Sequence, residues 1–271
     1  MEFALLNGHR SLPIPRSNGE CQFCGHPVIA KCGPQLIWHW AHRSRYSCDP
    51  WWENEGPWHR SWKNHFPSEF REVVAYDSLG EKHIADLKLP DGLVIELQHS
   101  SMTIEEMHSR ESFYDKMIWI VDAESFVRNI TIFDPLPNPK LPFVDDLIFY
   151  PPHPAWRRDR VSQKGSYKSL IVSRRSKNVP GSSMVEIESG RTITEDFDAT
   201  YIGHHLFLWM RPRAIWYQTT RPTFLDFGDG RIAKLMRYRE EKDIWCLKLK
   251  RKDDFINLLR SRISYPAADG R

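Results

Sequence analysis

Residues 83–100, HIADLKLPDGLVIELQHS, predict a β-hairpin that carries two carboxylates on one face. Pro90-Asp91-Gly92 is a turn signal between two runs in which apolar and polar residues alternate. With these three residues as the loop, Asp86 lies opposite Glu96, and Gln98 follows Glu96 on the same face. The other face is apolar, so we expect it to pack in the core.

The pairing of Asp86 with Glu96 requires an explanation, because like charges directly opposite each other destabilise a sheet. A Mg²⁺ ion between the two side chains would provide one, since Mg²⁺ takes oxygen ligands, usually one or two carboxylates with water and phosphate. The alternative is a solvated acidic face, which is common on exposed sheets. A register shift by one residue would also separate the pair.

The flanking segments predict a helix before the hairpin and a helix and a strand after it. NEGPWHRSWKNHFP (54–67) favours a helix with Asn54 as N-cap. One face of this helix carries polar residues spaced by four, namely Glu55, His59 and Lys63. REVVAYD follows as a strand, TIEE (103–106) is a capping box for the second helix, and MIWIVD favours a buried strand.

This order of elements resembles the restriction-endonuclease-like core of the PD-(D/E)XK nuclease superfamily. In that core a carboxylate on the second strand and an Asp/Glu-x-Lys on the third bind metal and position water. Asp86 and Glu96-x-Gln98 are similar to that motif, with Gln98 in the place of Lys. Over roughly residues 21–122 the chain more closely resembles the competence protein CoiA-like family. The residues that carry this resemblance are Glu55, His59, Lys63, Ala85, Asp86, Glu96, Gln98, Ser100, Arg110 and Tyr114.

The resemblance implies a deoxyribonuclease that depends on Mg²⁺ or Mn²⁺. Asp86 and Glu96 would bind the ion, which activates water and neutralises charge that builds on the phosphate. Gln98 can orient a water molecule but carries no charge. Lys63, or Lys88 on the same strand face as Asp86, would then supply the missing cation.

The remaining residues of the motif have more open roles. Glu55 would take an outer-shell or second-metal role. His59 either shuttles a proton or is simply a packed histidine. Arg110 and Tyr114 either contact DNA phosphate or brace the core.

Four of the five cysteines lie within residues 1–50 and predict a structural Zn²⁺ site. Cys21-x2-Cys24 and His39-x2-His42 are two ligand pairs at short spacing, which complete a tetrahedron at little cost in loop entropy. The residues between the pairs suit a β-hairpin that carries PVIAK and LIWHW. The CoiA-like family similarly begins with a cysteine knuckle and a His-Phe-Ala-His-like run, which here reads His39-Trp40-Ala41-His42. Either Cys32 or Cys48 could replace a ligand, and the alternative is a free-thiol segment.

Residues 150–180 carry a local excess of positive charge, with Arg157 and Arg158 at its centre. Such a stretch can follow the phosphate backbone of DNA. The alternative is a solvated linker.

Composition limits the class of protein. The chain has 271 residues, 41% of them hydrophobic and 13% aromatic, with a net charge of +3, so it can form a core and is no general polycation. No apolar run approaches the ~18–20 residues of a membrane span. The start lacks the pattern of a signal peptide, so we expect a cytoplasmic protein with no membrane association. Five cysteines then favour metal binding or free thiols over disulfides.

We therefore expect an α/β protein with a restriction-endonuclease-like core. The expected segments are a zinc-finger-like segment at 1–50, the nuclease core at 51–125, a Pro/Arg-rich basic connection at 126–200, and a small β-rich C-terminal domain with a final helix at 201–271. The expected function is DNA cleavage in competence-linked recombination or in defence against foreign DNA, with partner proteins from either process. Gln98 keeps open the alternative of a non-catalytic DNA-binding or recombination-mediator module. The strandedness of the DNA and the mode of cleavage stay open.

Overall fold

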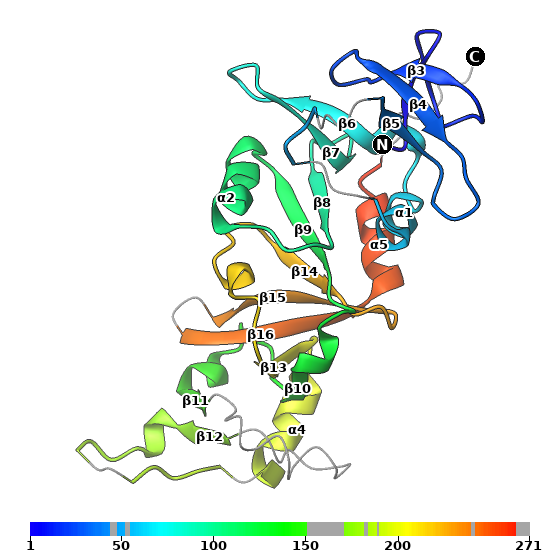
Figure 1. The fold of residues 1–271 in the computed structure, drawn as a ribbon. Coiled ribbons are helices and arrows are strands. Elements are labelled where there is room, and N and C mark those ends of the chain that lie inside the picture. The colour runs from blue at the N-terminus through cyan, green and yellow to red at the C-terminus, as the bar shows by residue number, and fades with distance from the viewer. Residues whose placement is uncertain are drawn as a thin grey trace, which may run out of the picture. The chain divides into compact units, whose positions relative to one another are not determined.

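A computed structural model describes residues 1–43, 48–51, 55–150, 171–181, 184–188, 190–239 and 242–263. The chain divides into two compact units (Figure 1). The first unit comprises Met1–Val121 and Ile256–Arg271, and the second comprises Asp122–Phe255. Among the described residues, every helix is too short or too polar to cross a membrane.

The first unit begins with a small antiparallel sheet of five strands in the order β2-β1-β3-β4-β5. The strands are β1 (Ala4–Leu6), β2 (His9–Ser11), β3 (Asn18–Glu20), β4 (Pro27–Lys31) and β5 (His39–His42). Strand β4, the predicted PVIAK, pairs with β5 in a hairpin, but the second strand is HWAH (39–42) and not LIWHW (36–40). Its small core contains the buried side chains of Cys21, Val28 and Trp40, so this sheet buries little apolar surface of its own.

The remainder of the first unit has the expected order of helix, three strands, helix and strand. The elements are α1 (Pro57–Lys63), β6 (Arg71–Tyr76), β7 (Lys82–Lys88), β8 (Val94–Gln98), α2 (Ile104–Phe113) and β9 (Met117–Asp122), with a 3-10 turn η1 (Ser68–Phe70) before β6. Strands β6, β7 and β8 pair antiparallel, whereas β9 pairs parallel to β8. A parallel pair needs a crossover, which α2 supplies.

The hairpin has the predicted register. Leu87 pairs with Ile95, and Lys88 pairs with Val94. The Leu89 amide donates to the Leu93 carbonyl at 2.8 Å. The apolar face is buried as expected.

Both helices of this core can be compared with their sequence patterns. Helix α1 has Gly56 as N-cap and ends at Lys63, while the expected cap Asn54 lies outside the described residues. His59, Trp62 and Lys63 are all buried, so the polar face of α1 does not face solvent. Helix α2 begins as predicted, with the Glu106 amide donating to Oγ1 of Thr103 at 3.1 Å.

The second unit contains five antiparallel strands in the order β10-β13-β16-β15-β14 and a separate pair, β11-β12. The strands are β10 (Ile130–Pro135), β11 (Leu147–Tyr150), β12 (Ile171–Arg174), β13 (His204–Trp209), β14 (Thr223–Asp226), β15 (Arg231–Arg239) and β16 (Lys242–Arg251). The second unit contains the helix α4 (Gly190–Thr200), and the boundary between the units falls within α5 (Lys252–Arg260). The 3-10 turns are η2 (Val127–Asn129), η3 (Pro142–Asp146), η5 (Arg175–Lys177) and η6 (Ala214–Tyr217). Ile193 and Phe197 of α4 pack with Leu206 and Tyr238 of the sheet.

One sequence expectation for this unit was wrong. Residues 126–200 hold β10, β11, β12 and α4, although their many prolines suggested an irregular connection. Residues 214–217, within the segment expected to be β-rich, form η6 with Trp216 buried. Arg157 and Arg158 lie outside the described residues, so their DNA contact stays a prediction.

Candidate active site and zinc centre

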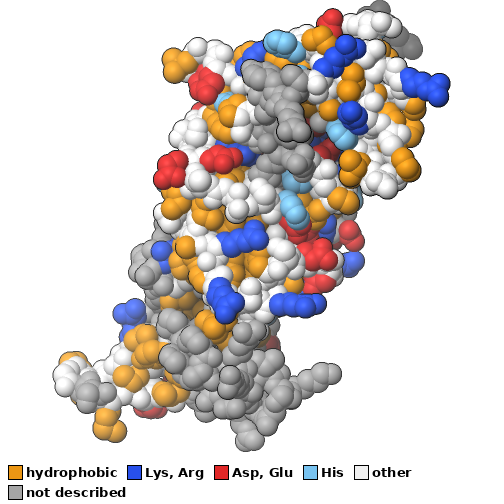
Figure 2. Space-filling view, viewed as in Figure 1, with side chains coloured by type: hydrophobic (Ala, Val, Ile, Leu, Met, Phe, Trp, Pro, Cys, Tyr) orange, Lys and Arg blue, Asp and Glu red, His pale blue; other side chains and the backbone are white. Residues whose placement is uncertain are grey.

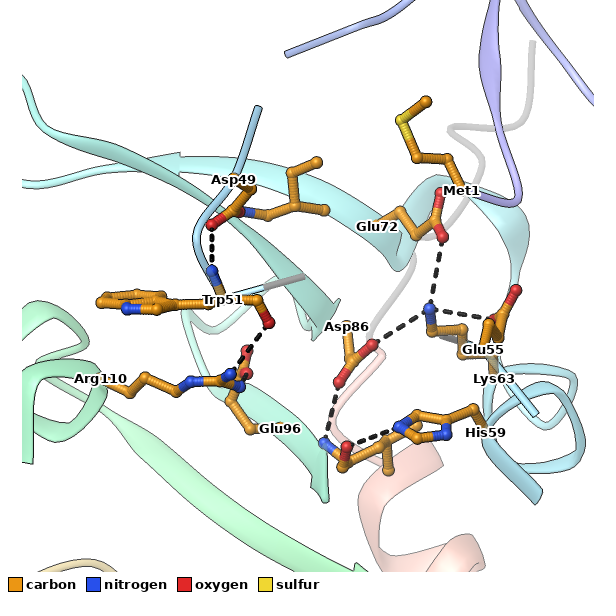
Figure 3. Close-up of a pocket in the computed structure, with 12 residues that line it drawn as sticks. Met1, Asp49, Trp51, Glu55, His59, Lys63, Glu72, Asp86, Glu96 and Arg110 are labelled. Carbon is orange, nitrogen blue, oxygen red and sulfur yellow. Dashed lines mark hydrogen bonds and ion pairs between the residues drawn. The ribbon is translucent and has the colours of Figure 1, made fainter. Parts of the chain in front are cut away.

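A cavity of about 50 Å³ lies in the first unit, where α1, β7 and β8 meet (Figure 3). That volume is enough for a metal ion or a few water molecules. Its walls come from the chain's first residue, the segment 48–51, α1, three strands and α2. The lining residues are Met1, Asp49, Trp51, Glu55, His59, Lys63, Glu72, Ile84, Asp86, Glu96, Leu97 and Arg110.

Five of the six side chains predicted to be catalytic line this cavity: Glu55, His59, Lys63, Asp86 and Glu96. His59 and Lys63 come from α1, whereas Glu55 precedes this helix, which begins at Pro57. The hairpin supplies Asp86 and Glu96. The sixth, Gln98, is fully buried and is not among the lining residues. Its Nε2 donates to the Ser100 carbonyl at 3.1 Å, so it holds the end of β8.

Lys63 is the central cation of the cavity (Figure 3). Its Nζ lies 3.1 Å from Oδ1 of Asp86, 3.1 Å from Oε1 of Glu55 and 3.4 Å from Oε1 of Glu72. Burial lowers the pKa of Lys63, but the charges of Asp86, Glu72 and Glu55 outweigh it and raise the pKa above its ordinary value. The ammonium group therefore stays charged and neutralises part of this acidic cluster.

Both oxygens of Asp86 have partners in the chain. Oδ1 accepts from Lys63, and Oδ2 accepts the backbone N–H of Leu97 at 2.9 Å. The carboxylate of Asp86 thus accepts the Leu97 N–H in place of a backbone carbonyl of β7. Asp86 is thereby fixed at the mouth of the cavity, with about 22% of its side chain exposed.

Glu96, unlike Asp86, has a partner for only one of its carboxylate oxygens among the described residues. It is 3% exposed; its Oε2 lies 3.2 Å from Arg110, and its Oε1 has no hydrogen-bond partner among the described residues. Burial, together with the charge of Asp86, raises the pKa of Glu96 to about 8 despite Arg110. Glu96 is therefore mostly protonated at neutral pH unless a further cation arrives. A buried carboxylate oxygen without a partner, beside a second carboxylate, fits the oxygen-ligand chemistry of Mg²⁺ or Mn²⁺.

His59 has a structural contact in this arrangement. It is buried, and its Nε2 lies 2.8 Å from the carbonyl oxygen of Leu97. With Nε2 as donor, this bond ties α1 to β8. This contact fits the packed histidine of the two sequence alternatives, while the proton shuttle stays a prediction, since His59 also lines the cavity.

Glu72 is a site residue that the sequence did not reveal. Its backbone has a φ of 43°, a left-handed conformation that costs a non-glycine residue roughly 1–2 kcal/mol. The carboxylate accepts the amides of Glu2 and Phe3 at 2.8 and 3.1 Å. Burial raises the pKa of Glu72, but Lys63 and these contacts lower it to about 2. A Glu near the start of a strand ordinarily faces solvent, so no sequence signal marked it.

Residues 48–51 also contribute to the site, although no sequence pattern predicted this. Oδ1 of Asp49 lies 2.9 Å from Nδ1 of His83, and Oδ2 accepts the Ile84 amide at 2.8 Å. The carbonyl oxygen of Trp51 accepts a hydrogen bond from Arg110 at 2.9 Å, and the Trp51 ring stacks on His83. The segment thus joins β7 to the arginine that holds Glu96.

Arg110 and Tyr114 are each 4% exposed. Arg110 contacts Glu96, Glu106 and the Trp51 carbonyl. Tyr114 packs near the rings of Trp51 and Phe113. This burial fits the bracing role better than direct contact with DNA phosphate.

Four metal-binding side chains converge in the N-terminal sheet region. The ligand atoms of Cys21, Cys24, His42 and Cys48 all lie within 4.8 Å of one another. Sγ of Cys21 is 3.7 Å from Sγ of Cys48, close to the ~3.8 Å that two thiolates take around a tetrahedral zinc with Zn–S of about 2.3 Å. Sγ of Cys24 is 3.2 Å from Nε2 of His42. This Cys₃His cluster is compatible with structural zinc.

The pKa of the Cys24 thiol is lowered, as expected for a metal ligand. Its partial burial raises the pKa, but hydrogen bonds from the His26 backbone and the His42 ring lower it to about 6. The thiolate, which is the form that binds zinc, is therefore favoured at neutral pH.

His39 is not part of this cluster, which corrects the predicted ligand set. Residues 39 and 42 both lie on β5, and positions three apart on a strand point to opposite faces. His39 instead directs its Nδ1 to the Ile37 carbonyl at 2.8 Å. Cys48 supplies the fourth side chain of the cluster, as one of the sequence alternatives had it.

Residues 16–50 match the family model of the N-terminal domain of competence protein CoiA. The matched segment contains all four residues of the Cys₃His cluster and supports the CoiA-like family. The chain matches no curated protein and no solved structure.

Proposed function

We propose that the chain is a metal-dependent nuclease that hydrolyses phosphodiester bonds of DNA on a restriction-endonuclease-like core. The observation that carries the proposal is the pair of Asp86 and Glu96 in one cavity with Lys63, where one buried oxygen of Glu96 has no hydrogen-bond partner among the described residues. The order of α1, β6, β7, β8, α2 and β9 supports the fold assignment.

Asp86 and Glu96 would hold Mg²⁺ or Mn²⁺. When bound, such an ion activates water and stabilises charge on the phosphate. Neighbouring groups of the chain fix the orientation of both carboxylates, because Arg110 holds one oxygen of Glu96 and the Leu97 amide holds one oxygen of Asp86. Lys63 supplies a fixed positive charge next to Asp86, which takes the place of the lysine missing at Gln98.

The zinc cluster has a structural role in this proposal. Residues 1–43 form only short strands around a small core. A metal that joins β5, the cysteine knuckle and Cys48 would supply folding free energy that this core lacks. The biological settings we propose are competence-linked recombination or defence against foreign DNA.

One observation favours the alternative of a non-catalytic DNA-binding or recombination-mediator module. Both oxygens of Asp86 already have partners, because Lys63 and the Leu97 amide satisfy them. A site that Lys63 keeps closed would bind no ion and cleave nothing.

The test is to incubate the purified chain with linear, circular and single-stranded DNA in Mg²⁺, Mn²⁺ or EDTA. We expect cleavage in the divalent cation and none in EDTA, and no cleavage by Asp86→Asn in either. Intact DNA in all three conditions, from a folded and zinc-loaded chain, would establish the alternative.

A further inference from the structure

Two lysines face each other directly on the sheet of the second unit. Lys234 of β15 pairs with Lys248 of β16 in the antiparallel register. Directly opposed residues of an antiparallel pair have Cβ atoms about 4.5–5.5 Å apart, so two like charges there destabilise the sheet. This pair poses the same physical problem as Asp86 and Glu96, with the opposite sign of charge.

Further positive charge surrounds this pair. Lys250 lies two residues beyond Lys248 and therefore on the same face of β16. Lys140 follows β10, and it acts on Lys248 together with Lys250 and Lys234. Burial and these three charges lower the pKa of Lys248 below its ordinary value, which agrees with the pairing of Lys234 and Lys248.

Within the described part of the chain, no carboxylate forms an ion pair with any of these four ammonium groups. Other cations of the second unit do have acidic partners, as in the contacts of Lys252 with Asp226 at 2.7 Å and of Lys177 with Glu188 at 2.8 Å. Among the described residues, the lysine cluster therefore lacks the compensating negative charge that Lys252 and Lys177 have.

We propose that Lys140, Lys234, Lys248 and Lys250 bind the phosphate backbone of DNA. This inference deepens the proposed function and rests on it for the identity of the anion. Counterions released from phosphates by lysines supply much of the affinity of DNA-binding proteins, and the same contacts would remove the repulsion between Lys234 and Lys248.

The shape of the cluster favours a chain of phosphates over a single small anion. The four lysines extend over two strands and the segment after β10. Phe224 pairs with Lys234 across the strands, and Met236 follows Lys234 on the same face, both half-buried. On the face of the molecule that Figure 2 shows, Lys and Arg side chains lie among hydrophobic side chains. Such a mixed surface suits phosphates together with sugar or base surfaces.

The opposite face of the same strands provides a matched control. Arg237 of β15 and Arg251 of β16 are exposed, and each lies three residues from a lysine of the pair, so each points to the other face. Changing them removes the same charge from the same two strands.

The experiment compares full-length Lys234→Gln/Lys248→Gln with full-length Arg237→Gln/Arg251→Gln. Binding to a duplex of about 30 base pairs and to a single strand of equal length is measured in EDTA over a series of salt concentrations. For the lysine variant we expect duplex affinity to fall about ten- to hundredfold at about 0.1 M salt, and the log–log salt slope to decrease by up to ~1.8. For the arginine variant we expect the parental affinity within about twofold and the parental slope.

Loss of the fold would not imitate this result. Removal of like-charge repulsion should leave the melting temperature of the lysine variant equal to the parent's or higher. A parent that does not bind DNA, an unchanged slope in the lysine variant, or an equal loss in the arginine variant would each overturn the inference. DNA binding through these lysines without cleavage in Mg²⁺ or Mn²⁺ would overturn the nuclease proposal alone.

Discussion

Nζ of Lys63 lies 3.1 Å from Oδ1 of Asp86, so an internal cation already neutralises a carboxylate that the proposed metal needs. The same ammonium group also contacts Glu55 and Glu72. Lys63 thus makes the assembly of three carboxylates possible without bound metal. A divalent ion at Asp86 and Glu96 would share Asp86 with this lysine.

Lys63→Met should therefore destabilise the chain by about 3–5 kcal/mol in EDTA, because it leaves buried carboxylates without their cation. Added Mn²⁺ or Mg²⁺ should restore part of that loss, as an ion replaces the ammonium group. The measurement is chemical unfolding with and without the metal. Lys88→Met is the control, since Lys88 lies on β7 two residues from Asp86 but is not among the residues that line the cavity. Equal stability of Lys63→Met and Lys88→Met would contradict the central role of Lys63.

The pKa of Glu96, about 8 in the folded chain against an ordinary value of 4.5, predicts a pH dependence of stability. Between these two values the folded state keeps a proton that the unfolded state has lost. The free energy of unfolding in EDTA should therefore fall as pH rises from about 4.5 to 8, by up to ~1.4 kcal/mol per pH unit from this group. Glu96→Gln should remove that part of the slope, and a variant with the parental slope would show that Glu96 titrates normally.

Metal binding should show the reverse dependence on pH. An ion that binds the carboxylate of Glu96 must displace its proton, so metal affinity should rise up to about tenfold per pH unit below pH 8 and level off above it. Calorimetric titration with Mn²⁺ at several pH values measures this directly. Metal affinity that is independent of pH would exclude Glu96 as a ligand.

The variant Arg110→Met distinguishes the two roles considered for Arg110, which are holding Glu96 in place and contacting DNA phosphate. If Arg110 braces Glu96, its loss should raise the pKa of Glu96 further and move the pH profile of metal binding to higher pH. The salt dependence of DNA binding should stay unchanged, because a buried arginine makes no phosphate contact. A salt slope reduced by ~0.9 with an unshifted pH profile would instead assign Arg110 to the DNA interface.

If the Cys₃His cluster binds zinc, two variants of nearby residues should differ in zinc content. Cys48→Ser should lower the zinc content from about one ion per chain and destabilise residues 48–51, whereas His39→Ala should keep the zinc. Elemental analysis together with the melting temperature measures both. Because Trp51 accepts a hydrogen bond from Arg110, Cys48→Ser should also weaken Mn²⁺ binding in the cavity. Zinc loss in His39→Ala with full retention in Cys48→Ser would favour His39 over Cys48 as the ligand.

The parts of the structure that the sequence predicted depend on local rules. The Pro90–Gly92 turn and the alternation of side chains determined the hairpin register, and Thr103 marked the start of α2. His39 failed as a ligand because its place on a strand reverses its direction, which pair spacing alone does not reveal. Glu72 depends on a left-handed backbone and on contacts with residues about 70 positions away, so no local pattern could have shown it.

The decisive prediction concerns the hairpin pair itself. Asp86→Asn and Glu96→Gln keep the size of each side chain but remove one ligand charge, so each should abolish metal-dependent cleavage. DNA binding in EDTA should persist in both variants, because the proposed phosphate contacts lie on other residues. Asp86→Asn also removes the partner of Lys63, so a melting temperature must confirm that it folds. Glu96→Gln serves as the cleaner variant, because the amide replaces a group that is already mostly protonated at neutral pH.

Gln98→Lys completes this test. The nuclease superfamily of the proposed assignment has a lysine at this position, yet Gln98 is fully buried, and its amide nitrogen donates to the Ser100 carbonyl. A lysine there would be buried near Glu96, so we expect lower stability and no gain in cleavage if Lys63 already supplies the catalytic cation. Increased cleavage by Gln98→Lys would show that Lys63 does not fill that role. Cleavage at the parental rate by both Asp86→Asn and Glu96→Gln would show that this carboxylate pair holds no catalytic metal.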